Sequence, residues 1–142
     1  MHSSTVQGHV VMNLVVSHEL SFRIVVDLDY DPADPFAVRF TFHLPGDAPV
    51  TWFFARELLL DGISRPTGEG DVHIHPVGEE LSEVCVVLHS PDGDARLVAS
   101  APPLIAFLAR TDRLVPMGEE PTGSELDEQL AAILAKGCEN LG

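Results

Sequence analysis

Apolar residues follow two patterns along the chain, one typical of strands and one typical of helices. The clearest strand pattern covers residues 38–44, where every second residue is apolar and the residues between are Arg39, Thr41 and His43. This alternation is typical of a strand with one buried face. Runs of β-branched and other apolar residues predict further strands at residues 10–16, 21–29, 50–54, 71–77, 81–89 and 95–100.

Helices are predicted from the positions of proline and glycine and from the spacing of leucines. A short helix is predicted at residues 55–60, with Gly62 at the position just past its end. Pro102 and Pro103 open a second helix, which extends to Arg113. A third helix is predicted near the C-terminus, where the apolar stripe consists of Leu126, Leu130, Ile133 and Leu134.

The order of these elements is strands then a helix, strands then a helix, and a last helix. Proline and glycine within residues 90–93 predict a tight turn that joins two of the strands as a hairpin. Runs of strands with helices at their ends are typical of the α+β class, in which the sheets are antiparallel. The chain has 142 residues, so we expect one domain over residues 1–142, with residues 1–8 as a flexible N-terminal tail.

Acidic residues far outnumber basic ones in this chain. Lys and Arg total 8 while Asp and Glu total 22, which gives a formal net charge of −14. Binding to nucleic acid or to anionic lipid requires clustered cations, and the arginines here are scattered singly, so no nucleic-acid partner is predicted. The apolar runs are far shorter than the roughly 20 residues of a membrane span, and the first residues do not resemble a signal peptide. We therefore expect a cytoplasmic protein with no direct membrane insertion.

Two histidines and two cysteines carry the most reactive side chains among the candidate residues. His73 and His75 alternate in a predicted strand and share one face, as metal ligands do, but no third ligand follows at a fitting spacing. Two half-exposed strand histidines are therefore the favoured interpretation. Cys85 lies inside an apolar run and Cys138 lies beyond a helix end, so both are predicted to be structural rather than nucleophilic.

Two loops also invite hypotheses of ligand binding. Residues 65–70 contain two glycines but lack the Gly-Lys-Ser/Thr ending and the strand-to-helix setting of a phosphate loop, so a turn is favoured. The acidic residues from Asp29 to Asp34 offer carboxylates to a cation, but they lack the pattern of an EF-hand. Trp52 and Phe54 are predicted to pack at a strand-to-helix junction. The sequence thus predicts no catalytic, metal-binding or cofactor-binding residues and no cofactor, and it leaves the partner-binding residues unassigned.

Several stretches of the chain carry motifs that occur together. These are Tyr30-Asp31-x-x-Asp34-Pro35-Phe36-Ala37-Val38, Trp52-x-Phe54-Ala55-Arg56-Glu57-Leu58-Leu59, Gly62, Arg65-Pro66-Thr67-Gly68-x-Gly70-Asp71-Val72, Ser90-Pro91-x-Gly93, Phe107-Leu108-x-Arg110-Thr111-Asp112 and Val115-Pro116-x-Gly118-x-Glu120. With these motifs in this order, the sequence resembles the SsgA-like proteins of sporulating actinomycetes. It departs from the family pattern at Ala109, where many members are expected to have lysine.

The resemblance implies a non-enzymatic cell-division adaptor that positions or supports the septum during sporulation. It implies FtsZ or another SsgA-like protein as the partner, a place at the division septum, and assembly into a homo-trimer. It also implies a fold like that of the whirly single-stranded nucleic-acid binders, with two antiparallel β-sheets, short helices and a C-terminal helix. The alternative function, single-stranded nucleic-acid binding, follows from that fold alone and would require a basic groove with stacking aromatic residues.

Overall fold

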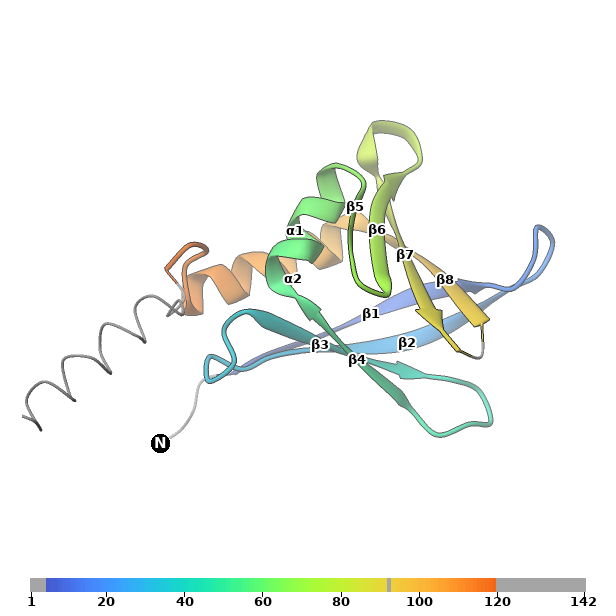
Figure 1. Ribbon diagram of the computed structural model, residues 1–142, viewed down its shortest axis with the longest axis horizontal. Helices are drawn as coiled ribbons and strands as arrows, with labels where there is room; N and C mark the ends of the chain where they lie inside the picture. Colours follow the sequence, from blue (N-terminus) through green and yellow to red (C-terminus); the bar gives the residue numbers. More distant parts are fainter. Residues whose placement is uncertain (1–4, 92, 120–142) are drawn as a thin grey trace, which may run out of the picture.

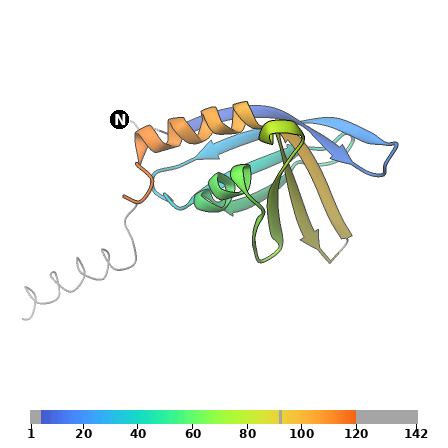
Figure 2. The same ribbon diagram turned by 90° about the horizontal axis from the view of Figure 1, so that it is seen from above.

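Eight strands form one curled antiparallel sheet, and two helices lie inside the curl (Figures 1 and 2). The computed structural model describes residues 5–91 and 93–119. In chain order the elements are β1 (Val6–Val15), β2 (Ser21–Tyr30), β3 (Ala37–His43), β4 (Val50–Ala55), α1 (Arg56–Ser64), β5 (Thr67–Glu69), β6 (Val72–Val77), the 3-10 turn η1 (Glu79–Leu81), β7 (Glu83–Ser90), β8 (Gly93–Ser100) and α2 (Ala101–Leu114).

The sheet consists of two meanders that share one seam. Its strand order is β4-β3-β2-β1-β8-β7-β6-β5, so β1–β4 form one half and β5–β8 form the other. Each half is followed by its helix, α1 or α2. The seam is the pairing of β1 with β8, where Asn13, Leu14 and Val15 lie opposite Val98, Leu97 and Arg96.

The expected whirly-like architecture with two separate sheets is wrong. The residues that the structure describes form a single sheet, because β1 pairs with β2 along its whole length and with β8 at its C-terminal end. Each meander alone would leave the main-chain groups of its edge strand, β1 or β8, unpaired on this side. The short seam pairs part of both strands. The pairing joins segments about eighty residues apart, which neither alternation nor turn signals in the sequence specify.

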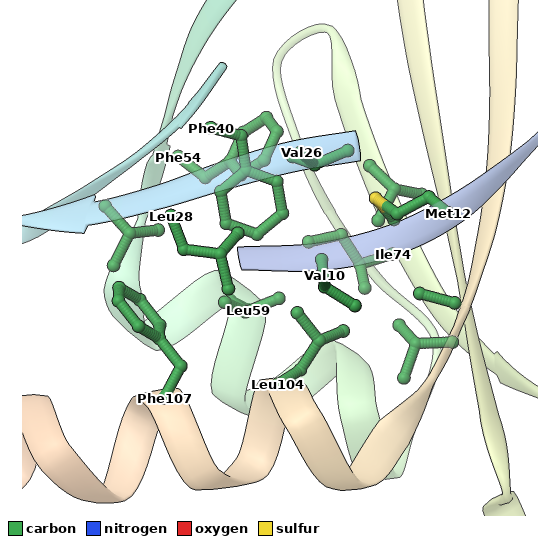
Figure 3. Packing of buried hydrophobic residues seen from close by; sticks show 14 of the residues in the cluster. Val10, Met12, Val26, Leu28, Phe40, Phe54, Leu59, Ile74, Leu104 and Phe107 are labelled. Atoms are coloured by element: carbon green, nitrogen blue, oxygen red, sulfur yellow. The ribbon is translucent and has the colours of Figure 1, made fainter. Parts of the chain in front are cut away.

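Alternating residues of the first four strands bury one face of the sheet against the helices. The alternation predicted for residues 38–44 is confirmed, since Val38, Phe40 and Phe42 are buried. Phe40 contacts Phe54 edge to face, with the ring centroids 4.7 Å apart. Figure 3 shows these two rings beside apolar side chains of β1, β2, α1 and α2 in one continuous core. The predicted packing of Phe54 is thus observed, and Trp52 is partly buried against the same core.

Helix α1 is longer than predicted and does not end at its glycine. It runs from Arg56 to Ser64, so Gly62 lies inside the helix rather than past its end. A Cβ atom at Gly62 would overlap the Ile74 side chain on β6, so the missing side chain lets α1 approach the sheet. The helix stops before Pro66, which restricts the preceding Arg65 to the extended backbone that it adopts.

Three further expectations concern the ends of the chain and the central link. β1 begins at Val6, so residues 6–8 of the expected tail belong to the sheet. The link at residues 65–70 includes the short strand β5. Pro102 and Pro103 stand in the first turn of α2, as predicted. The predicted C-terminal helix lies outside the described residues.

Candidate protein-interaction surface

One face of the sheet is covered by neither of the two described helices, and its side chains form what we call the open face. Val11 and Val25 lie opposite each other on this face and are 43% and 47% exposed. Phe53 of β4 lies opposite Arg39 of β3 and is 62% exposed. Exposed apolar side chains that share one face are typical of surfaces that contact other proteins.

A second exposed apolar group lies at the turn between β1 and β2, which we call the hairpin tip. It consists of Val16, Leu20 and Phe22, each about half exposed. Phe22 lies opposite Leu14 and therefore belongs to the helix-covered face of the sheet. In Figure 1 the hairpin extends away from α1 and α2, so neither of these two described helices covers this end of that face.

A buried arginine joins the two halves of the fold. Arg56, the first residue of α1, is fully buried. Its Nη1 donates hydrogen bonds to the carbonyl oxygens of Val115 (2.7 Å) and Thr111 (3.2 Å), at the C-terminal end of α2. Its guanidinium also lies 4.9 Å from the ring centroid of Tyr30, as in a cation–π contact. We call these four residues the arginine clamp.

The arginine clamp places a cation where α2 ends. The last carbonyl groups of a helix lack partners within it and carry partial negative charge, so a guanidinium stabilises them. Tyr30 is held in turn, because its hydroxyl donates to the carbonyl oxygen of Pro35 at 2.9 Å. Nothing in the local sequence pattern predicted this cluster, although Arg56, Tyr30 and Thr111 all lie in the family motifs. The available signal was a single arginine directly after the apolar Phe53-Phe54-Ala55.

The structure places one further histidine or cysteine beside each of the two histidines that were candidate metal ligands. His73 lies against Gly68 and contacts the His89 ring edge to face, with centroids 5.1 Å apart. His89 in turn bonds through Nδ1 to Asp94 at 2.7 Å. His75 lies opposite Cys85 in the ladder. Within residues 5–91 and 93–119, no three His, Cys, Asp or Glu side chains are arranged to hold a metal ion.

Cys85 is buried in β7, in agreement with its predicted structural role. Burial raises the pKa of its thiol, and the smaller opposing effect of Arg96 lowers it. The thiolate is the reactive form, so the folded chain holds Cys85 in an unreactive state. Cys138 lies outside the described residues.

We predict that the Cys85 thiol is not labelled by Ellman's reagent in the folded protein at pH 8. The measurement uses the full chain with Cys138→Ser, so that Cys85 alone reports. One thiol per chain should react once denaturant is added, because unfolding removes the burial that raises the pKa. Full labelling within minutes without denaturant would contradict the structural assignment.

The two loops considered as ligand sites make internal contacts instead. Asp31 Oδ1 accepts a hydrogen bond from the Ala33 amide at 2.9 Å, and Asp29 pairs with Arg39 at 3.3 Å. The acidic carboxylates therefore stabilise a turn and a ladder pair. Residues 65–70 connect α1 to β6 through β5, and no helix follows them to direct amide groups at a phosphate.

The arginines do not form the basic groove that a single-stranded nucleic-acid binder requires. Arg56 is buried, Arg39 pairs with Asp29, and Arg65 pairs with Asp61. Arg110 donates to the carbonyl oxygen of Gln7. All seven arginines lie in the described part of the chain, and four of them are engaged in these contacts.

None of the described helices is long and apolar enough to cross a membrane.

Comparison with known proteins defines the class to which this fold belongs. The model of the family described as "Streptomyces sporulation and cell division protein, SsgA" matches residues 24–120, which is more than half of the chain. The chain is 45% identical to the sporulation-specific cell division protein SsgB of Streptomyces coelicolor, over 94% of this chain and 98% of that protein. It is 43% identical to SsgB of Thermobifida fusca, over 93% and 96% of the two chains. The class is therefore that of the sporulation-specific cell division proteins.

Solved structures agree with this assignment. A structure from a study described as "Mutations in SsgB correlate to longitudinal cell division during sporulation of Streptomyces coelicolor" superposes with a TM-score of 0.78 at 46% identity, over 83% of this chain and 94% of that one. The crystal structure of an SsgA-like sporulation-specific cell division protein from T. fusca gives a TM-score of 0.79 at 42% identity, over 92% and 96% of the chains. The chain belongs to the SsgA family, and the SsgB branch is the part of the family that its motifs resemble most.

Proposed function

We propose that this chain is a non-enzymatic adaptor that supports septum formation during sporulation-specific cell division. In this role it acts in the cytoplasm at the division septum and binds FtsZ or another SsgA-like protein. The observation that carries the proposal is the 45% identity to S. coelicolor SsgB over nearly the full length of both chains. The apolar residues of the open face, Val11, Val25 and Phe53, supply a surface for a protein partner.

The proposal includes assembly into a homo-trimer. The hairpin tip and the open face are two different apolar surfaces on one chain, and contact between unlike surfaces of neighbouring copies closes into a ring when the rotation fits. A net charge of −14 per copy opposes assembly, and salt screens that repulsion. Sedimentation at several concentrations should therefore show a trimer whose share rises from 50 to 500 mM NaCl. A monomer under all these conditions would contradict this part of the proposal.

Direct binding to FtsZ tests the adaptor role. The full chain is immobilised, and purified actinomycete FtsZ is titrated over it in biolayer interferometry at 150 mM salt. We expect saturable binding, with no signal from an unrelated acidic protein of similar net charge that serves as the control. Equal signals from FtsZ and from the control protein, or no binding of FtsZ, would refute FtsZ as the partner. Immobilised copies of other SsgA-like proteins then test the other partner class.

A further inference from the structure

Strand β1 keeps an open edge over most of its length. It pairs with β2 from Val6 to Val15, but with β8 only from Asn13 to Val15. Figure 1 shows β8 diverging from β1 beyond this short seam. Within residues 5–91 and 93–119, no strand pairs with this side of β1 between Val6 and Met12.

One hydrogen bond identifies the main-chain groups that face this open side. Arg110 Nη1 of α2 donates to the carbonyl oxygen of Gln7 at 2.7 Å, so Gln7 directs its main-chain groups away from β2. Every second residue of a strand directs its N–H and C=O to the same side. His9 and Val11 therefore present their amide hydrogens and carbonyl oxygens to the open side, in line with Asn13, where the pairing with β8 begins.

A groove lies beside these two residues. One depression of about 510 Å³ lies between β1 and β8, and its walls include Val11, Val98 and Ser100. A second depression of about 320 Å³ lies between β1 and α2, and its walls include Phe107. Both depressions include His9 among their lining residues. The groove therefore follows the open edge of β1. Apolar side chains lie along it on both faces of the sheet, and Arg23 and Glu83 also line the first depression.

We propose that an extended segment of the division partner adds to the sheet as a strand at this edge, pairing with the main chain of His9 and Val11. This inference rests on the proposed function. Alternating donors and acceptors along a strand edge are matched by another extended main chain, as in β-strand addition. Exposed Val11 on one face and the exposed Pro103 and Ala106 of α2 on the other favour apolar side chains at successive positions of the segment.

The shape of the groove favours a single segment over a second copy of this chain. The groove is bounded at one end by Asn13, where β8 joins β1, and at the other end by Arg110 on Gln7. The six residue steps between Gln7 and Asn13 span about 20 Å at 3.3 Å per residue. This length holds about five residues of an extended chain.

Amide hydrogen exchange, followed by NMR on the full chain, tests the register. In the free protein, the amides of His9 and Val11 should exchange at least tenfold faster than those of Val10 and Met12, which face β2. Saturation with purified FtsZ should slow exchange at His9 and Val11 at least tenfold. Slow exchange at both residues in the free protein would overturn the open edge. Unchanged exchange in a chain that does bind FtsZ would overturn this docking site while the proposed function stands.

Substitution of the edge supplies an independent test. Val11→Pro removes one amide hydrogen that no described strand uses, and proline is tolerated on such edges. We expect at least a tenfold loss of affinity for FtsZ, whereas Val11→Thr, which keeps the amide hydrogen and the branched shape, should bind within twofold of the original chain. His9→Pro replaces Val11→Pro if circular dichroism shows that the latter does not fold. Equal binding by a folded proline variant would overturn the site, and no binding of FtsZ by the original chain would refute FtsZ as the partner in both proposals. In the hydrogen-exchange experiment, protection of the His9 and Val11 amides that rises with the concentration of this chain alone would show that the edge mediates self-association. That result would overturn the proposal of a partner segment.

Discussion

Replacing Arg56 by methionine is expected to lower the free energy of unfolding by about 3 kcal/mol. Methionine fills much of the same volume but cannot donate, so the buried carbonyl oxygen of Val115 loses a charge-assisted hydrogen bond of 2.7 Å. A hydrogen bond to a charged group contributes about 1.5–3 kcal/mol, and a buried acceptor left without its donor costs about 1–3 kcal/mol. Loss of the cation–π contact with Tyr30 adds to this effect. For a chain of this size the melting temperature should fall by roughly 10 °C.

Thermal and urea unfolding of both proteins, followed by circular dichroism, measures this effect. Arg65→Met is the matched control, because Arg65 is 71% exposed and pairs with Asp61 only on the surface. Exposed ion pairs contribute about 0–1 kcal/mol, so the control should stay close to the original protein. If Arg56→Met and Arg65→Met unfold at the same denaturant concentration, the arginine clamp does not hold the two halves together.

Replacing Phe40 by alanine should destabilise the chain by about 3–5 kcal/mol, the typical cost of removing a phenylalanine from a core. Phe40 is fully buried, and it packs edge to face against Phe54 and beside Phe42. Alanine removes this packing, and the surrounding strands and α1 cannot close the whole cavity. We expect the urea midpoint to fall accordingly, with little change in the slope of the unfolding curve.

Phe53 provides the comparison for Phe40, because it lies on the neighbouring strand and on the opposite face. Its side chain is 62% exposed, so Phe53→Ala should change the free energy of unfolding by less than about 0.5 kcal/mol. Comparing the unfolding free energies of the two variants separates the effect of losing core packing from the effect of losing an aromatic ring at an exposed position. A loss of more than 2 kcal/mol for Phe53→Ala would show that its exposed face is covered, for example by a second copy of the chain.

The arginine clamp also gives the family motifs a physical meaning. Tyr30, Arg56 and Thr111 come from three separate motifs, and they meet at one buried point where the end of β2, the start of α1 and the C-terminal end of α2 come together. These motif residues therefore stabilise the fold that the family shares. The open face and the edge of β1 contribute the surface that is available to partners.

The strands and helices whose burial pattern is local could be predicted from the amino-acid sequence alone. Alternation at residues 38–44 specified which side chains enter the core, because successive residues of a strand must face opposite sides. Pro102 and Pro103 marked the start of α2, because proline suits the first turn of a helix and no later one. The buried position of Cys85 followed in the same way from its apolar neighbours.

How these elements join, and which strand edge stays unpaired, depends on contacts between segments that are distant in the sequence. The single sheet depends on contact between Asn13–Val15 and Arg96–Val98, which are distant in sequence and carry no local signal of their pairing. Gly62 was predicted to end the helix, because glycine is common at that position. In the structure it lies inside α1, where the lack of a side chain leaves room for Ile74. Burial of Arg56 likewise required the end of α2 to be near, since a guanidinium leaves water only where carbonyl oxygens and an aromatic face replace its hydration.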